Sequence, residues 1–180
     1  MKRKPFRTDL PDNELIQIGI TSFGYLSTSE IVFSEKIRSI CEDNQCQNYG
    51  KTWACPPAVG TFQECRNKCL SYSSAFVFAS TYQLEDSFDF DGMLQGHRQF
   101  KNVCDRLYEQ LEYPFMLLSN EGCIRCQKCT YPVYPCRFPD KLFPSLEGYG
   151  IIVNELAKSA GIPYNFGINT VSYFGLVCYN

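Results

Sequence analysis

AFVFAS (residues 75–80) and FMLLS (residues 115–119) are two apolar runs of strand length, and the segment that they enclose decides the fold. Between them, side chains of one helical face recur at steps of three and four residues: Met93, His97, Phe100, Cys104, Leu107 and Leu111. Strand, helix and strand predict a βαβ unit. Because both strands are apolar throughout, we expect them to be parallel and joined by a right-handed crossover.

Three further helices and one strand are expected around this unit. Ser34 is placed to cap a short helix that runs through Ile40, and TFQE (61–64) has the form of a capping box for a helix to about Tyr72. Ser145 opens a third helix with one buried stripe, and Gly161 followed by Pro163 ends that helix. TVSYFGLVC (170–178) reads as the last strand.

The N-terminal part predicts an arm and a strand pair. Residues 1–13 are polar, basic and rich in Pro, which is typical of a flexible arm. ELIQIGI (14–20) and EIVF (30–33) are short runs rich in β-branched residues and predict two strands. We therefore expect one α/β or α+β domain over residues 14–180, with cysteine-rich loops at 41–69 and 121–144.

Composition excludes several classes of protein. The 180 residues carry 17 Lys and Arg against 19 Asp and Glu, a formal charge of −2, which argues against a nucleic-acid binder that works by bulk positive charge. No apolar run approaches the roughly 18 residues that a membrane span needs. The basic start at residues 1–4 is not followed by the apolar run of an export signal, so a soluble, cytoplasmic protein is expected.

The cysteines dominate the chemistry of the chain. There are 11 Cys and one His, and in a reducing compartment such crowding indicates metal ligation by thiolates rather than disulfides. Thiolate-rich sites favour zinc or iron-sulfur clusters over other metals.

The second cysteine loop gives the most specific signal. Cys123, Cys126 and Cys129 follow the C-x2-C-x2-C spacing of ferredoxin cluster loops, and Cys136 is near enough to be the fourth ligand. The six-residue gap before Cys136 departs from the ferredoxin run. A four-cysteine zinc site is the alternative, although zinc sites usually show two separated Cys pairs.

The first loop offers five thiols for a second site. Cys41, Cys46 and Cys55 are joined by Cys65 as the expected fourth ligand, because Cys65 lies in the first turn of its helix, where the helix dipole favours a thiolate. Cys69 is the alternative to Cys65. Cys55 precedes a Pro-Pro pair, and Trp53, the only Trp, serves either as a core anchor or as a cluster shield.

Other chemistry-bearing residues have plainer interpretations. Cys104 and Cys178 are expected to be buried small hydrophobes, and His97 a core or interface histidine. Four cations surround the second loop and either offset the charge of a thiolate site, form a docking face or are solvated surface charges: Arg125, Lys128, Arg137 and Lys141. No catalytic set of Ser, His and Asp is apparent.

YGKTWACPP (49–57), with Cys41 and Cys46 before it and the four cysteines of the second loop after it, resembles domain of unknown function family 2284. This family of small prokaryotic proteins is catalogued as predicted metal-binding proteins. The similarity runs from about Glu30 to the C-terminus and includes PSLEGYG (144–150) and FGL (174–176). The resemblance implies metal or iron-sulfur binding, often in anaerobes. It transfers the candidate ligands and no catalytic residue.

Three functions compete at this point. The first is an iron-sulfur protein with two [4Fe-4S] clusters that exchanges electrons with a redox partner protein. The second is a cluster-dependent enzyme or sulfur- or metal-handling protein with an open iron site. The third is a structural zinc protein. The sequence decides neither an enzymatic reaction nor the oligomeric state.

Overall fold

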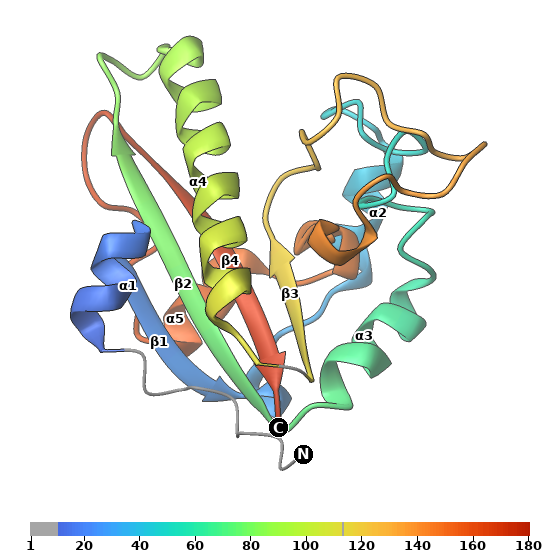
Figure 1. The fold of residues 1–180 in the computed structure, drawn as a ribbon, viewed down its shortest axis with the longest axis horizontal. Coiled ribbons are helices and arrows are strands. Elements are labelled where there is room, and N and C mark those ends of the chain that lie inside the picture. Colours follow the sequence, from blue (N-terminus) through green and yellow to red (C-terminus); the bar gives the residue numbers. More distant parts are fainter. Residues whose placement is uncertain (1–10, 113) are drawn as a thin grey trace.

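The computed structural model describes residues 11–112 and 114–180, and these form a four-stranded sheet with helices on both faces (Figure 1). The strands are β1 (Ser22–Ser27), β2 (Ser74–Gln83), β3 (Phe115–Ser119) and β4 (Thr170–Tyr179), in the spatial order β1-β2-β4-β3. Every paired neighbour is antiparallel. The α/β class expected from the sequence is confirmed.

The βαβ unit is split. β2 and β3 run in the same direction, as expected, but they do not touch, because β4 lies between them and pairs antiparallel with both. Apolar side chains fill both faces of these strands because helices cover the sheet on both sides, and that burial does not require neighbouring parallel strands. The final strand of the chain is thus inserted into the middle of the sheet.

The alternation of side chains along β2 divides the core in two. Phe76 and Phe78 face α1 (Asp12–Ile18) and α4 (Phe90–Gln110). Ala75, Val77 and Ala79 face the opposite layer, which contains α3 (Phe62–Leu70) and α5 (Val153–Ser159). The sheet is therefore the middle of three layers, with small residues toward α3 and α5 and aromatic residues toward α4.

The helices predicted from capping signals are present. Ser34 accepts the Lys36 N–H at the start of α2 (Glu35–Glu42), and Thr61 forms a reciprocal capping box with Glu64 at the start of α3. No helix of the described residues is both long and apolar enough to cross a bilayer.

Two predictions near the N-terminus are wrong. The run 14–20 is not a strand: residues 12–18 form α1, because Leu15 and Ile18 lie three apart and pack together onto the α4 side of the sheet. The run 30–33 is not a strand either, since a 3₁₀ turn occupies Thr28–Glu30 and only Phe33 makes a β-bridge, with Ile151. β1 takes their place. The predicted arm lies outside the described residues up to position 10, and α1 begins inside its range.

The helix predicted from Ser145 is interrupted. A 3₁₀ turn at Glu147–Tyr149 ends at Gly150, whose φ of 75° is left-handed, and α5 starts only at Val153. A Cβ at Gly150 would lie 2.5 Å from the Phe62 ring, so glycine is required there. The break turns the segment toward the cysteine loops instead of continuing the helix.

Candidate metal centre

Both cysteine loops meet at the end of β3. Ser119, the last residue of β3, pairs with Ser145 in a parallel bridge, so the second loop leaves and returns at one point of the sheet. The Ser145 N–H also donates to the Ala54 carbonyl of the first loop at 2.9 Å. Figure 1 accordingly shows the loop before α3 and the loop after β3 side by side. One anchoring point positions both sets of thiols.

The four thiols of the second loop line one cavity. Cys123, Cys126, Cys129 and Cys136 share it with Trp53 of the first loop. Main-chain N–H groups turn toward two of the sulfurs: Phe138 N–H donates to Cys136 Sγ at 3.4 Å, and the Arg125 backbone donates to the thiol of Cys123. Burial raises the pKa of Cys123, and the Arg125 hydrogen bond opposes that rise. The loop therefore brings all four predicted ligands to the wall of one cavity.

The cations around this loop have definite partners. Arg125 forms an ion pair with Asp105 and lies over the Phe138 ring, 5.9 Å from its centroid. Lys141 pairs with Glu109 at 2.8 Å, and Arg137 donates to the Lys128 carbonyl at 3.0 Å. Two of the four cations are thus held by carboxylates of α4, which ties the second loop to that helix.

Trp53 joins the two loops. Its indole N–H donates to the Tyr134 carbonyl at 3.1 Å, and its ring meets Tyr131 edge-on with the centroids 4.9 Å apart. Trp53 is half-buried and borders the cavity of the four thiols. The structure therefore places this residue beside the candidate metal centre and outside both apolar clusters of the core.

Three thiols of the first loop form a second group. The thiols of Cys41, Cys46 and Cys55 interact electrostatically, and the Glu147 carboxyl acts on two of them. Burial, Glu147 and the neighbouring thiols raise the pKa of Cys41 to about 11. Cys55 is buried and lies beside the hydroxyls of Thr52 and Ser145, which lower its pKa against the larger effect of burial.

Cys65 and Cys69 are the buried residues of α3 and belong to the core. Cys65 donates to the Val59 carbonyl at 3.4 Å and lies near Arg38. Cys69 packs against Cys178, and both thiols are completely buried. Arg38 and Cys69 act on the thiol of Cys65. Cys65 remains the predicted fourth ligand of the first site.

Two residues of the first site escaped the sequence analysis. Arg38 is a buried cation whose guanidinium donates to the Gly148 carbonyl and, at 2.6 Å, to the Gly60 carbonyl. Glu147 is half-buried, and loss of hydration raises the pKa of its carboxyl to about 7. Glu147 belongs to the quoted segment 144–150, so that motif was the available signal. No motif pointed to Arg38.

The interpretations of three other residues agree with the structure. Cys104 and Cys178 are fully buried, and burial raises the pKa of Cys104 to about 12. His97 is buried and stacks on Tyr173 with the ring centroids 5.4 Å apart. Its Nε2 atom has no hydrogen-bond partner among the described residues.

The donor set of the second loop fits a thiolate-bound metal. Four thiols around one cavity, with main-chain N–H groups directed at sulfur, are what a tetrahedral zinc or a cubane cluster requires. Over residues 11–112 and 114–180, however, no three His, Cys, Asp or Glu side chains already stand in a metal-coordinating arrangement. The thiols are gathered, and binding must draw them closer.

Comparison with known protein families finds a match to a family of predicted metal-binding proteins. The family described as "Predicted metal-binding protein (DUF2284)" matches residues 24–179, which includes both cysteine loops and all four strands except the start of β1. Searches of the curated proteins and of the solved structures found no match.

Proposed function

The chain belongs to the DUF2284 family of predicted metal-binding proteins, and from this premise we propose that it is an iron-sulfur protein with two [4Fe-4S] clusters that exchanges electrons with a partner redox enzyme. Cys123, Cys126, Cys129 and Cys136 hold one cluster. Cys41, Cys46, Cys55 and Cys65 hold the other. When bound, each cluster supplies one-electron redox chemistry.

The observation that carries this proposal is the single cavity lined by all four thiols of the second loop. The C-x2-C-x2-C spacing brings three of them together over a short stretch, and Cys136 closes the set from the far side of the loop. The N–H groups directed at Cys123 and Cys136 stabilise negative charge on sulfur, as cluster sites do. Closed four-thiolate sites suit electron transfer because they leave no open position for a substrate.

The contact between the two loops supports an electron-transfer role. Trp53 lies two residues before Cys55 and borders the cavity of the second set of thiols. The two candidate centres therefore adjoin each other at the same edge of the sheet. Beside them, Val133, Tyr134 and Phe138 expose apolar surface next to Lys128 and Arg137, which suits transient docking of a partner protein.

All eleven cysteines are free thiols in the structure. We infer a cytoplasmic location, because ligation of metal by this many cysteine thiolates needs a reducing compartment.

The first site favours a second candidate function. Three thiols and the Glu147 carboxyl act on one another there, whereas Cys65 is buried on α3 beside Arg38 and Cys69. A centre held by three thiolates has an open position and suits Lewis-acid chemistry on a bound substrate or handling of sulfur or metal. In this alternative the protein is an enzyme and only the second loop holds a closed centre.

The deciding experiment measures iron, acid-labile sulfide and zinc per chain in protein purified without oxygen, together with the visible spectrum. About eight iron and eight sulfide, with broad absorbance near 400 nm, are expected for two cubane clusters. Stoichiometric zinc without sulfide or colour, in protein made under iron-replete anaerobic conditions, would identify structural zinc sites and overturn the proposal.

The fourth ligand of the first site is tested by paired variants. Cys65→Ser is expected to lower the iron content of the first centre if Cys65 binds, and Glu147→Gln to leave it unchanged. Unchanged iron content in Cys65→Ser would establish the open-site alternative. Cys104→Ala is the matched control, because it removes a buried thiol of α4 that is not a candidate ligand.

A further inference from the structure

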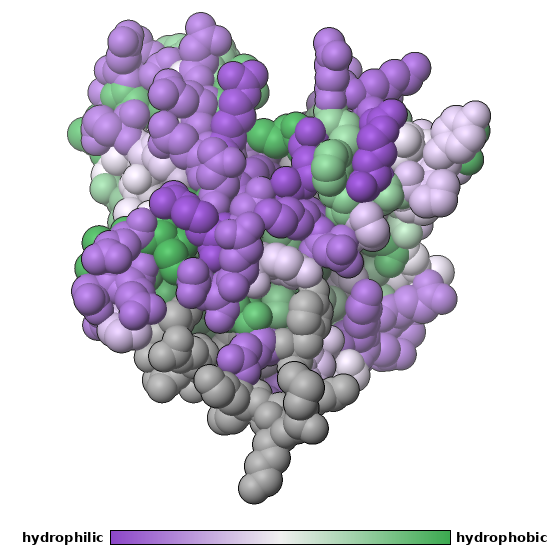
Figure 2. Space-filling model, viewed as in Figure 1, coloured by the Kyte–Doolittle hydropathy of each residue, from purple (hydrophilic) through white to green (hydrophobic). Residues whose placement is uncertain are grey.

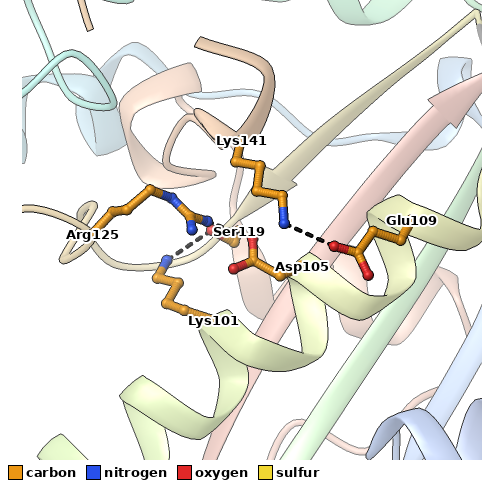
Figure 3. A network of polar contacts seen from close by, with 6 residues as sticks. All are labelled: Lys101, Asp105, Glu109, Ser119, Arg125 and Lys141. Carbon is orange, nitrogen blue, oxygen red and sulfur yellow. Dashed lines mark hydrogen bonds and ion pairs between the residues drawn. The ribbon is translucent and has the colours of Figure 1, made fainter. Parts of the chain in front are cut away.

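A second cavity adjoins the four thiols on the side of α4. Its volume is about 280 Å³, and it lies between α4, the end of β3 and the second loop. It shares Cys123, Arg125 and Lys141 with the thiol cavity. Figure 3 shows side chains from α4 and from the loops converging here around Asp105.

The lining of this cavity is strongly basic. Arg98, Lys101, Arg125 and Lys141 line it, and Asp105 is the sole carboxylate among its described lining residues. Asp105 pairs with Arg125, and Glu109, outside the cavity, pairs with Lys141. These pairs leave the charges of Lys101 and Arg98 without a direct anionic partner in the described part of the chain.

Lys101 is the central group. Its ammonium donates to Ser119 Oγ at 2.7 Å and to the Asn120 carbonyl at 2.9 Å, and both acceptors are uncharged (Figure 3). Burial lowers the pKa of Lys101, and the charges of Cys104, Glu147, Cys123 and Glu121 partly offset that effect. A desolvated ammonium held by neutral acceptors is costly unless an anion completes its coordination.

Arg125 adds an unused donor. Its guanidinium is engaged by Asp105, yet its Nε atom is buried and has no hydrogen-bond partner among residues 11–112 and 114–180. Buried donors in native proteins are nearly always paired, so this Nε atom is a donor left unsatisfied next to the cavity. Asn102 and Ser119 provide further polar groups on the same walls, while Phe143 closes an apolar side.

We propose that this cavity binds a small multiply oxygenated anion, an inorganic oxyanion or a short carboxylate, held by Lys101, Arg98 and Arg125 directly beside Cys123. The volume of about 280 Å³ is large enough to admit such an anion. The site places the anion next to a thiol of the candidate metal centre. It does not depend on which metal that centre holds.

Isothermal titration calorimetry on metal-free and metal-loaded protein tests this site with inorganic phosphate, sulfate and malonate, and with glycerol as the uncharged control. At least one anion is expected to bind with a dissociation constant on the order of 1 mM or below at low ionic strength. Tighter binding of phosphate or sulfate than of malonate would identify an inorganic oxyanion as the ligand, and tighter binding of malonate would identify a carboxylate.

Matched variants locate the binding. Arg98→Ala changes an exposed side chain and is expected to raise the dissociation constant of the anion by roughly fivefold. Lys101→Gln is expected to raise it by roughly tenfold or more, since each variant removes a charge-assisted contact. Arg106→Ala, an exposed cation on the same helix that does not line the cavity, is expected to leave the affinity within about twofold.

Two results would overturn the inference. One is the absence of binding by all three anions at about 20 mM in both forms of the protein. The other is a Lys101→Gln variant that loses metal while its anion affinity equals that of the parent, which would show that Lys101 only offsets thiolate charge. Because Arg98→Ala leaves the buried network intact, it decides the question even where Lys101→Gln folds poorly.

Discussion

Trp53 donates its indole N–H to the carbonyl of Tyr134 at 3.1 Å, across 81 positions of sequence. This hydrogen bond links the first cysteine loop to the tip of the second. The adjacent edge-on contact with Tyr131 adds an aromatic pair to the same junction. Since neither loop contains regular α-helix or strand around these residues, the relative position of the two sets of thiols depends on a few such contacts.

Trp53→Ala is expected to lower the free energy of unfolding by about 1–2 kcal/mol, because it removes an aromatic pair and one hydrogen bond at a partly exposed site. Trp53→Phe retains the ring, loses the N–H and is expected to lose about half as much. Far-UV circular dichroism in urea measures this, since Trp53 is the only Trp and its fluorescence disappears in both variants. Equal stability of the Ala variant and the parent would show that the junction is not a structural link.

Cys126→Ser is expected to abolish metal binding at the second loop and to leave the first site largely loaded. Its iron and sulfide content is then about half that of the parent under the two-cluster proposal. Cys104→Ala is the control, because Cys104 is fully buried on α4 and does not line the thiol cavity. Full metal content in Cys126→Ser, or a lost centre in Cys104→Ala, would refute the assignment of ligands.

Arg38→Ala is expected to destabilise the fold by about 2–4 kcal/mol. The variant leaves the carbonyls of Gly60 and Gly148 without their buried donor and separates α2 from the Glu147 turn. Arg38→Lys keeps the charge and lacks the fork that reaches both carbonyls, so it is expected to recover less than half of the loss. Urea denaturation gives both values. Full recovery by Lys would mean that charge, not the bridging geometry, makes the contribution.

The local elements were predictable where sequence signals are local. The caps at Ser34 and Thr61 fixed the starts of α2 and α3, and the period of three and four residues identified α4. The pairing of strands was not predictable in the same way. The βαβ unit is split because β4, the last strand in the sequence, lies between β2 and β3. Nothing in the sequences of β2 and β3 specifies β4 as their neighbour.

The candidate site likewise contains residues that local sequence spacing predicts and residues that only the fold brings there. The spacing of Cys123, Cys126 and Cys129 predicted one group of thiols because it acts within a short loop. Lys101 and Glu147 reach the site from α4 and from the turn before α5, so only the fold brings them there. For residues 14–20 even the local prediction was wrong. Leu15, Ile16, Ile18 and Ile20 suit a strand as well as a helix, and only the packing beside α4 selects the helix.

His97 makes stability depend on pH. Burial, with a smaller effect of Lys101, lowers the pKa of its imidazole from 6.5 to about 4, so the folded protein keeps it neutral. Below pH 6.5 the unfolded chain binds this proton more readily than the folded one, and stability falls as the pH drops from 6.5 toward 4. Above pH 6.5 the contribution is fully present. It is at most about 3 kcal/mol.

His97→Phe keeps a ring to stack on Tyr173 and removes the titration together with the unpaired Nε2 atom. The difference in unfolding free energy between the variant and the parent is therefore expected to be constant above pH 7 and to shift in favour of Phe by about 1–3 kcal/mol between pH 6.5 and pH 4.5. Urea denaturation at a series of pH values measures that difference. Its slope is the readout, so a constant cost of fitting the larger ring does not disturb it. Parallel curves for the two proteins across this range would show that His97 takes up its proton in the folded state as readily as in the unfolded one.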